Sequence, residues 1–305
     1  MLPLALLGGG LQQLLQAWHV RDAELSAVGR AKVTQSIATV GVSLAAAPLL
    51  AAAGAMGAMG LVGGVLAGSW AGLWTLWART EALKRALTRL TVQRVASAWR
   101  RFRAEAAWST LASLANTLSF ALVPLLLARH YGVAEVGYYA LMQRVALGPI
   151  GLIGAAVSQS FWAEAAQLMR SDPAALARLY KRSTLRLAWV ALPLSLLALA
   201  GPWYVGPLFG SGQWADAGWV LAASVPLLIG QAVASPLSHL VIHRKQHWKA
   251  AWDSVRVLLL VVAIEASAGA GLGFAWIVFV VSLVMAAMYL VLVLMNLRAL
   301  RMAGA

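Results

Sequence analysis

The sequence predicts an all-α, polytopic integral membrane protein. Of its 305 residues, 61% are hydrophobic and only 11% are charged, whereas soluble domains are about 45–50% apolar and about 25% charged. The apolar residues come in blocks of about 20, the length that crosses a hydrocarbon core as a helix. Fourteen tryptophans agree with this class, because indole rings favour the membrane–water interface.

The apolar blocks predict about nine membrane spans. We expect them at residues 1–17, 34–53, 57–77, 108–128, 136–159, 185–205, 219–242, 255–268 and 272–295. The stretch after the third span is rich in arginine and carries Leu83, Leu87, Leu90 and Val95 at near-helical spacing, which is typical of a basic amphipathic helix on a membrane surface. The predicted domains are therefore a partial N-terminal lobe (1–78), a basic cytoplasmic connector (79–107) and a six-helix C-terminal lobe (108–305).

Basic residues predict the orientation of the chain. The net charge is +14, and all but two of the 24 Lys and Arg residues lie in alternate loops or in the C-terminal tail. By the positive-inside rule those segments, including the C-terminus, are cytoplasmic. The charge thus follows from membrane topology, and we expect no nucleic-acid partner. With nine spans, Met1 would lie outside, so either the first span inserts in reverse or helices that preceded it are missing.

Span three carries glycines at every fourth position, namely Gly60, Gly64, Gly68 and Gly72. Small residues at this spacing let two membrane helices approach closely. We expect the partner to be a neighbouring helix of the same chain, with a homodimer as the alternative.

The sequence predicts neither a metal site nor a cofactor. There are no cysteines, so disulfides, thiol catalysis and Cys-ligated metals are excluded. His239, His243 and His247 follow each other at four-residue steps, and two such histidines on a helix can share a metal. However, no carboxylate accompanies them and basic residues surround them, so we expect interfacial histidines there.

Outside the first span, we single out few strongly polar residues inside the predicted spans. They are Gln35, Asn116, Arg144, Gln159, Gln231 and Glu265. Amides at membrane depth usually bond a neighbouring helix, which is the structural alternative for Gln35, Asn116 and Gln231. Asp253 and Arg256, three residues apart in "WDSVR", predict an ion pair at the membrane interface.

Arg144 is the most informative of these residues. It keeps its charge at any accessible pH, and the only acidic residue of its span is Glu135 at the outer end. At 1.5 Å per residue it would lie roughly 12 Å below the start of the span. Snorkelling to the surface is one explanation. The other is a water-lined cavity, where a permanent cation suits phosphate and binds it through two hydrogen bonds.

Several stretches resemble a known family. They are "LLLARHYGVAEVGYYALMQRVALGPIGLIGAAVSQSFWAEAA", "GPLFGSGQWADAGWV", "ASPLSHLVIHRKQHWKAAWDSVR" and, near the N-terminus, "LQQLLQAWHVRDAELSAVGRAKVTQS". Together they resemble the bacterial Wzx-type oligosaccharide flippases of the multidrug/oligosaccharidyl-lipid/polysaccharide exporter superfamily.

The resemblance implies twelve helices in two lobes around a cationic cavity, of which about three N-terminal helices have no counterpart here. It implies transport of undecaprenyl-diphosphate-linked oligosaccharide from the cytoplasmic to the periplasmic leaflet of the bacterial inner membrane, for polysaccharide or lipopolysaccharide (O-antigen) synthesis. The arginine of "YYALMQR" corresponds to Arg144. We expect Arg144, Arg129, Asn116 and Gln35 to contact the diphosphate or the glycan, and membrane lipids and polysaccharide polymerase or assembly proteins to be further partners.

Three alternatives stay open. A cation-coupled drug or lipid exporter of the same superfamily needs a carboxylate buried in a lobe, and the sequence places none there clearly. A membrane enzyme such as a glycan ligase or polymerase needs a large polar outer loop, whereas the predicted outer loops are short. A non-transporting scaffold is the third alternative, supported by the shortened first lobe.

Cysteine accessibility tests the predicted orientation. In this cysteine-free chain, Ser211→Cys is expected to react with a membrane-impermeant thiol reagent added outside intact cells, because residue 211 lies in a predicted outer loop. Ser97→Cys is expected to react only after the membrane is permeabilised. Labelling in the opposite order would show that the topology is inverted.

Overall fold

The computed structural model describes residues 2–21, 24–52, 58–81, 85, 88, 91–210, 212–238 and 246–304. Within these ranges the chain forms helices and turns and no strand, which confirms the all-α prediction. It divides into two compact units, Met1–Ala98 and Trp99–Ala305. The division falls within the predicted connector 79–107, of which Leu83, Leu87 and Leu90 lie outside the described residues.

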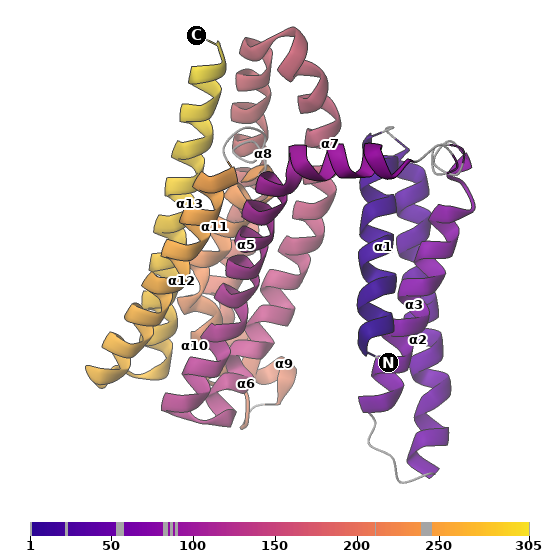
Figure 1. Ribbon diagram of the computed structural model, residues 1–305. Coiled ribbons are helices and arrows are strands. Elements are labelled where there is room, and N and C mark those ends of the chain that lie inside the picture. Colours follow the sequence, from indigo (N-terminus) through magenta and orange to yellow (C-terminus); the bar gives the residue numbers. More distant parts are fainter. Residues whose placement is uncertain are drawn as a thin grey trace. The chain divides into compact units, whose positions relative to one another are not determined.

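Three helices make up the N-terminal unit and correspond to the first three predicted spans. They are α1 (Leu2–Arg21), α2 (Leu25–Ala52) and α3 (Ala58–Trp77). Helix α3 packs against both α1 and α2 (Figure 1). Its position between them follows from its row of glycines, because a helix surface without side chains can contact two neighbours closely.

The glycines of α3 face helices of the same chain, as predicted. A Cβ atom added to Gly64 would lie 2.6 Å from the Thr39 carbonyl oxygen of α2, and one added to Gly68 would lie 2.8 Å from the Gln35 carbonyl oxygen. A Cβ atom on Gly72 would meet the Gln12 side chain of α1. These positions therefore need glycine for close helix contact.

The C-terminal unit contains the remaining helices. They are α5 (Val92–Tyr131, which begins in the first unit), α6 (Val133–Met142), the π-helical turn η1 (Gln143–Leu147), α7 (Gly148–Ser171), α8 (Pro173–Leu199), α9 (Gly201–Phe209), α10 (Ala217–Ala223), α11 (Val225–Ala234), α12 (Gln246–Gly269) and α13 (Phe274–Gly304). Helix α13 packs against α8, α10, α11 and α12, and its buried Ile277, Val281 and Leu292 belong to the main apolar core of this unit.

Several helices are long and apolar enough to cross a membrane. Among the described residues these are Val92–Tyr131, Val133–Met169, Ala174–Leu199 and Phe274–Leu300, and a fifth span results if the pair Ala217–Ala223 and Val225–Ser238, bent by 49°, crosses as one. The protein is therefore a polytopic helical membrane protein. Helices α1, α2, α3 and α12 coincide with the other predicted spans, for which membrane crossing stays a prediction.

The first turns of α5 form an exposed amphipathic segment. Val92, Val95, Trp99 and Phe102 are all exposed, and their spacing of three, four and three residues places them on one side of the helix. Basic residues flank this side, namely Arg94, Arg100, Arg101 and Arg103. Such a pattern is typical of a helix that lies on an anionic lipid surface.

The close approach of α2 and α3 predicts a strong contrast between neighbouring glycines. Gly64→Ala is expected to lower the thermal unfolding temperature of the purified protein, because the new methyl group overlaps Thr39 and overpacking costs about 1–3 kcal/mol. Gly63→Ala is the matched control, since an added Cβ there has no neighbour within 4 Å. Equal unfolding temperatures of the two variants would show that the contact does not hold α2 and α3 together.

Candidate functional site

Arg144 lies in the π-helical turn η1, between α6 and α7. Pro149 follows Arg144 by five residues. Proline has no N–H to donate, and in a regular α-helix its ring would clash with the carbonyl group one turn earlier. The chain avoids this clash by widening the turn, and the Gly148 N–H donates to the Gln143 carbonyl oxygen five residues earlier. Single π turns inside α-helices occur frequently at functional sites.

The Arg144 side chain is exposed. It makes no hydrogen bond or ion pair with any residue in the described ranges, including Glu135, the acidic residue of the same predicted span. An unpaired arginine inside a membrane span is costly, and such residues usually face a cavity or an ion pathway. Its planar guanidinium has five donors, which fit the oxygen atoms of a phosphate group.

Arg129, the second predicted site residue, is paired. Its Nη1 lies 3.6 Å from Glu265 Oε1, and Nε2 of the adjacent His130 lies 3.1 Å from the other oxygen of the same carboxylate. The Arg129 side chain is 71% exposed, so the pair adds little to stability. The carboxylate comes from α12, far along the chain, and the sequence alone did not indicate this pairing. Glu265 offsets much of the charge that Arg129 could offer an anion.

Asn116, the third predicted site residue, accepts a hydrogen bond from a buried arginine. Arg256 Nη2 donates to Asn116 Oδ1 over 2.8 Å, and Arg256 Nε donates to Ser119 Oγ over 3.2 Å. These bonds join α12 to α5. The structural alternative for Asn116, a bond to a neighbouring helix, is therefore what the structure contains.

Arg256 belongs to a charged cluster inside the C-terminal unit. Its Nη2 lies 3.0 Å from Asp253 Oδ1, and Lys249 donates to the second oxygen of Asp253. The guanidinium also lies 4.5 Å from the ring centre of Trp252, whose indole N–H donates to the Met288 carbonyl oxygen. Arg256 thus joins α12 to α5, and the adjacent Trp252 joins α12 to α13.

The burial of this cluster corrects one expectation. The predicted ion pair between Asp253 and Arg256 exists, and their side chains are 0% and 1% exposed, so it lies within the helix bundle. A carboxylate is therefore buried in the C-terminal lobe after all. Two cations, Lys249 and Arg256, contact this carboxylate, which leaves the cluster with one net positive charge.

Gln35, the fourth predicted site residue, belongs to the N-terminal unit. Its Oε1 accepts a hydrogen bond of 2.8 Å from Nε2 of Gln12, which is buried. This bond joins α2 to α1, as the structural alternative predicted. The sequence did not single out Gln12, because the polar residues of the first predicted span were left aside. Gln35 thus belongs to the N-terminal unit and the other three predicted site residues to the C-terminal unit. In the described chain, only Arg144 of the four is without a partner.

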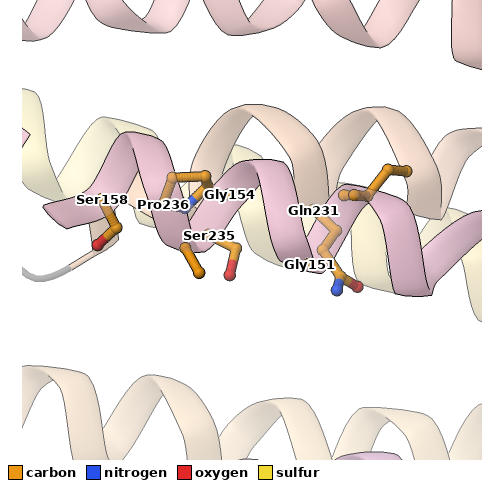
Figure 2. Close-up of a pocket in the computed structure, with 8 residues that line it drawn as sticks. Gly151, Gly154, Ser158, Gln231, Ser235 and Pro236 are labelled. Atoms are coloured by element: carbon orange, nitrogen blue, oxygen red, sulfur yellow. The ribbon is translucent and has the colours of Figure 1, made fainter. Parts of the chain in front are cut away.

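A pocket of about 220 Å³ lies between α7 and the C-terminal end of α11, as Figure 2 shows. Its polar lining consists of Ser158, Gln231 and Ser235. Gln231 Oε1 is buried and has no hydrogen-bond partner among the residues that the structure describes, so within them the predicted bond to a neighbouring helix is not made through this oxygen. The two serines were not indicated by the sequence, since serine is common in membrane helices.

Of the three histidines considered as metal ligands, the structure describes only His247. His239 and His243 lie outside the described residues. Among the described residues, no group of three or more His, Asp and Glu side chains could hold a metal ion.

The buried cluster predicts that two arginines differ sharply in their effect on stability. Arg256→Leu is expected to destabilise the protein by about 3–5 kcal/mol, because Asp253, Asn116 and Ser119 lose a buried partner. Arg129→Leu is the control and is expected to cost less than about 1 kcal/mol, since its ion pair is exposed. Denaturant unfolding of both purified variants measures the difference, and equal losses would contradict the structural role of Arg256.

Comparison with known proteins gives one family. Residues 1–218 match the family described as "Polysaccharide biosynthesis protein". No curated protein and no solved structure matches the chain. Because the match covers well over half of the sequence and the described chain contains several membrane-crossing helices, this protein is a membrane protein of the polysaccharide biosynthesis family.

Proposed function

We propose that this protein is a flippase that carries an undecaprenyl-diphosphate-linked oligosaccharide from the cytoplasmic to the periplasmic leaflet. A role in polysaccharide biosynthesis or export follows from the family. The observation that supports translocation in particular is Arg144, a cation within a membrane-crossing helix that has no partner in the described chain.

The physical task of such a protein explains this arrangement. The lipid tail stays in the bilayer, whereas the diphosphate and the glycan must pass a region that is hostile to charge. A fixed cation along the path lowers that barrier without covalent chemistry, so we propose a transporter and no enzymatic step. The interaction must stay modest, because tight capture would prevent release on the other side.

The remaining assignments belong to the same proposal. The distribution of basic residues supports a multi-pass protein of the bacterial inner membrane with a cytoplasmic C-terminus. Its partners would be the lipid-linked oligosaccharide, membrane lipids and the proteins that polymerise or assemble the glycan. We propose no nucleic-acid partner, no metal and no cofactor.

A cation-coupled drug or lipid exporter is the second candidate, and buried Asp253 is the observation that raises it. A coupling ion would have to bind this carboxylate, but Lys249 and Arg256 already contact it. The net positive charge of the cluster opposes a further cation, so the lipid-diphosphate carrier is the better supported of the two.

Substitution of Arg144 tests the proposed function. Arg144→Ala is expected to abolish export of the glycan, because the diphosphate loses its cation in the span. Arg144→Lys is expected to keep part of the export, since lysine supplies the charge without the planar fork that binds phosphate through two bonds. Surface polysaccharide is measured in cells that depend on the full chain, with membrane insertion checked in parallel.

Arg178→Ala is the matched control for this experiment. Arg178 lies in α8, is 70% exposed and pairs with Asp172, which precedes this helix. The charge pattern places this stretch between the predicted spans in the cytoplasm. We expect normal export from this variant. Normal export from Arg144→Ala as well would remove Arg144 from the transport path.

A further inference from the structure

The pocket between α7 and α11 has a chemistry of its own. Its lining consists of Ile150, Gly151, Gly154, Ala155, Ser158, Gln231, Ser235 and Pro236. None of these residues carries a charge, and the polar groups are two hydroxyls and one carboxamide. Figure 2 shows the side chains of Ser158, Ser235 and Gln231 directed to the same side of the two helices. The pocket therefore offers neutral hydrogen-bond donors and acceptors within a membrane protein.

One of these groups lacks a partner. Within the described residues, Gln231 Oε1 is buried and accepts no hydrogen bond, whereas buried polar atoms nearly always have a partner. A buried acceptor left unpaired costs about 1–3 kcal/mol. If the Gln231 carboxamide turned toward the pocket, a ligand hydroxyl could reach this oxygen and remove the cost by donating to it.

The two α7 positions in this lining that are occupied by glycine have different structural reasons for a glycine. A Cβ atom on Gly154 would lie 3.2 Å from Pro236 Cγ, so close contact with the segment after α11 explains that glycine. A Cβ atom on Gly151 would have no neighbour within 4 Å. Helix packing therefore does not require glycine at position 151, and its missing side chain leaves the pocket open.

We propose that this pocket binds one sugar ring of the transported glycan through its hydroxyl groups. This inference rests on the proposed function and names the contact for the neutral part of that substrate. A volume of about 220 Å³ is below the roughly 300–1,000 Å³ of sites for drug-sized ligands, which fits a single ring and not a whole oligosaccharide. The absence of charge in the lining suits hydroxyl groups and not a diphosphate.

The pocket and Arg144 lie on one continuous helical segment. Gly151 follows Arg144 by seven residues, which corresponds to about 10 Å along a helix. One ligand can therefore place its anionic diphosphate near the arginine and a nearby sugar ring in the pocket. The two sites divide the recognition between charge and hydrogen bonding.

Binding of two lipids to the purified full chain tests the proposal. The probes are polyprenyl diphosphate and the same lipid carrying one N-acetylglucosamine, measured by native mass spectrometry. Gly151→Leu and Gln231→Leu are expected to weaken binding of the sugar-bearing lipid about tenfold, the equivalent of one lost hydrogen bond of about 1.4 kcal/mol. Binding of the sugar-free lipid is expected to be unchanged. Ala156→Leu, an exposed position of α7 outside the pocket, is the matched control.

The outcomes separate this inference from the proposed function. If both pocket variants bind the two lipids as the unmodified protein does, the pocket is not a sugar site, while the flippase proposal stands. If the pocket variants lose both lipids equally, the effect is not specific for sugar and the inference fails. If the unmodified protein binds neither lipid, the proposed function fails and the inference fails with it.

Discussion

The constraint on which this structure depends is that a bilayer offers no hydrogen-bond partner to the backbone. Every amide group at membrane depth must be satisfied within the chain, and helices achieve this locally. Two departures from regular helix in the C-terminal unit adjoin prolines: the π turn η1 precedes Pro149, and the bend of 49° between α10 and α11 precedes Pro226. In both places the irregular backbone still finds acceptors, since the Gly148 N–H donates to the Gln143 carbonyl oxygen and the Ser224 N–H donates to the Val220 carbonyl oxygen.

Two arginines in the C-terminal unit show opposite solutions to the problem of charge in a membrane. Arg256 is buried and surrounded by Asp253, Asn116 and Ser119, so its charge is used to connect helices. Arg144 is exposed and has no such partners in the described chain. The first arginine is costly only when a partner is removed. Arg144 lowers the stability of the protein before any substrate binds, and a passing anion would supply its missing partner.

The same distinction applies to neutral polar groups. The amides of Gln12 and Gln35 satisfy each other and hold α1 to α2, whereas Gln231 presents a buried oxygen without a partner beside a pocket. Satisfied groups stabilise a helix bundle, and unsatisfied groups next to open space are available for a ligand. Arg144 and the pocket therefore form the most coherent candidate path in the C-terminal unit, and both lie along the segment that comprises η1 and α7.

The sequence by itself determined the fold class and the close packing of the α3 glycines, and it singled out Arg144 as a candidate. These features depend on local composition and on periodicity, which can be read along a single helix. Tertiary structure decided which polar residues are already paired. Asn116 contacts Arg256 across 140 positions of sequence, and Arg129 contacts Glu265 across a similar distance. A pattern along one helix does not say which neighbour faces it. The partners of these residues therefore emerge only when the helices pack, as does the lack of a partner for Arg144 and for Gln231 Oε1 within the described chain.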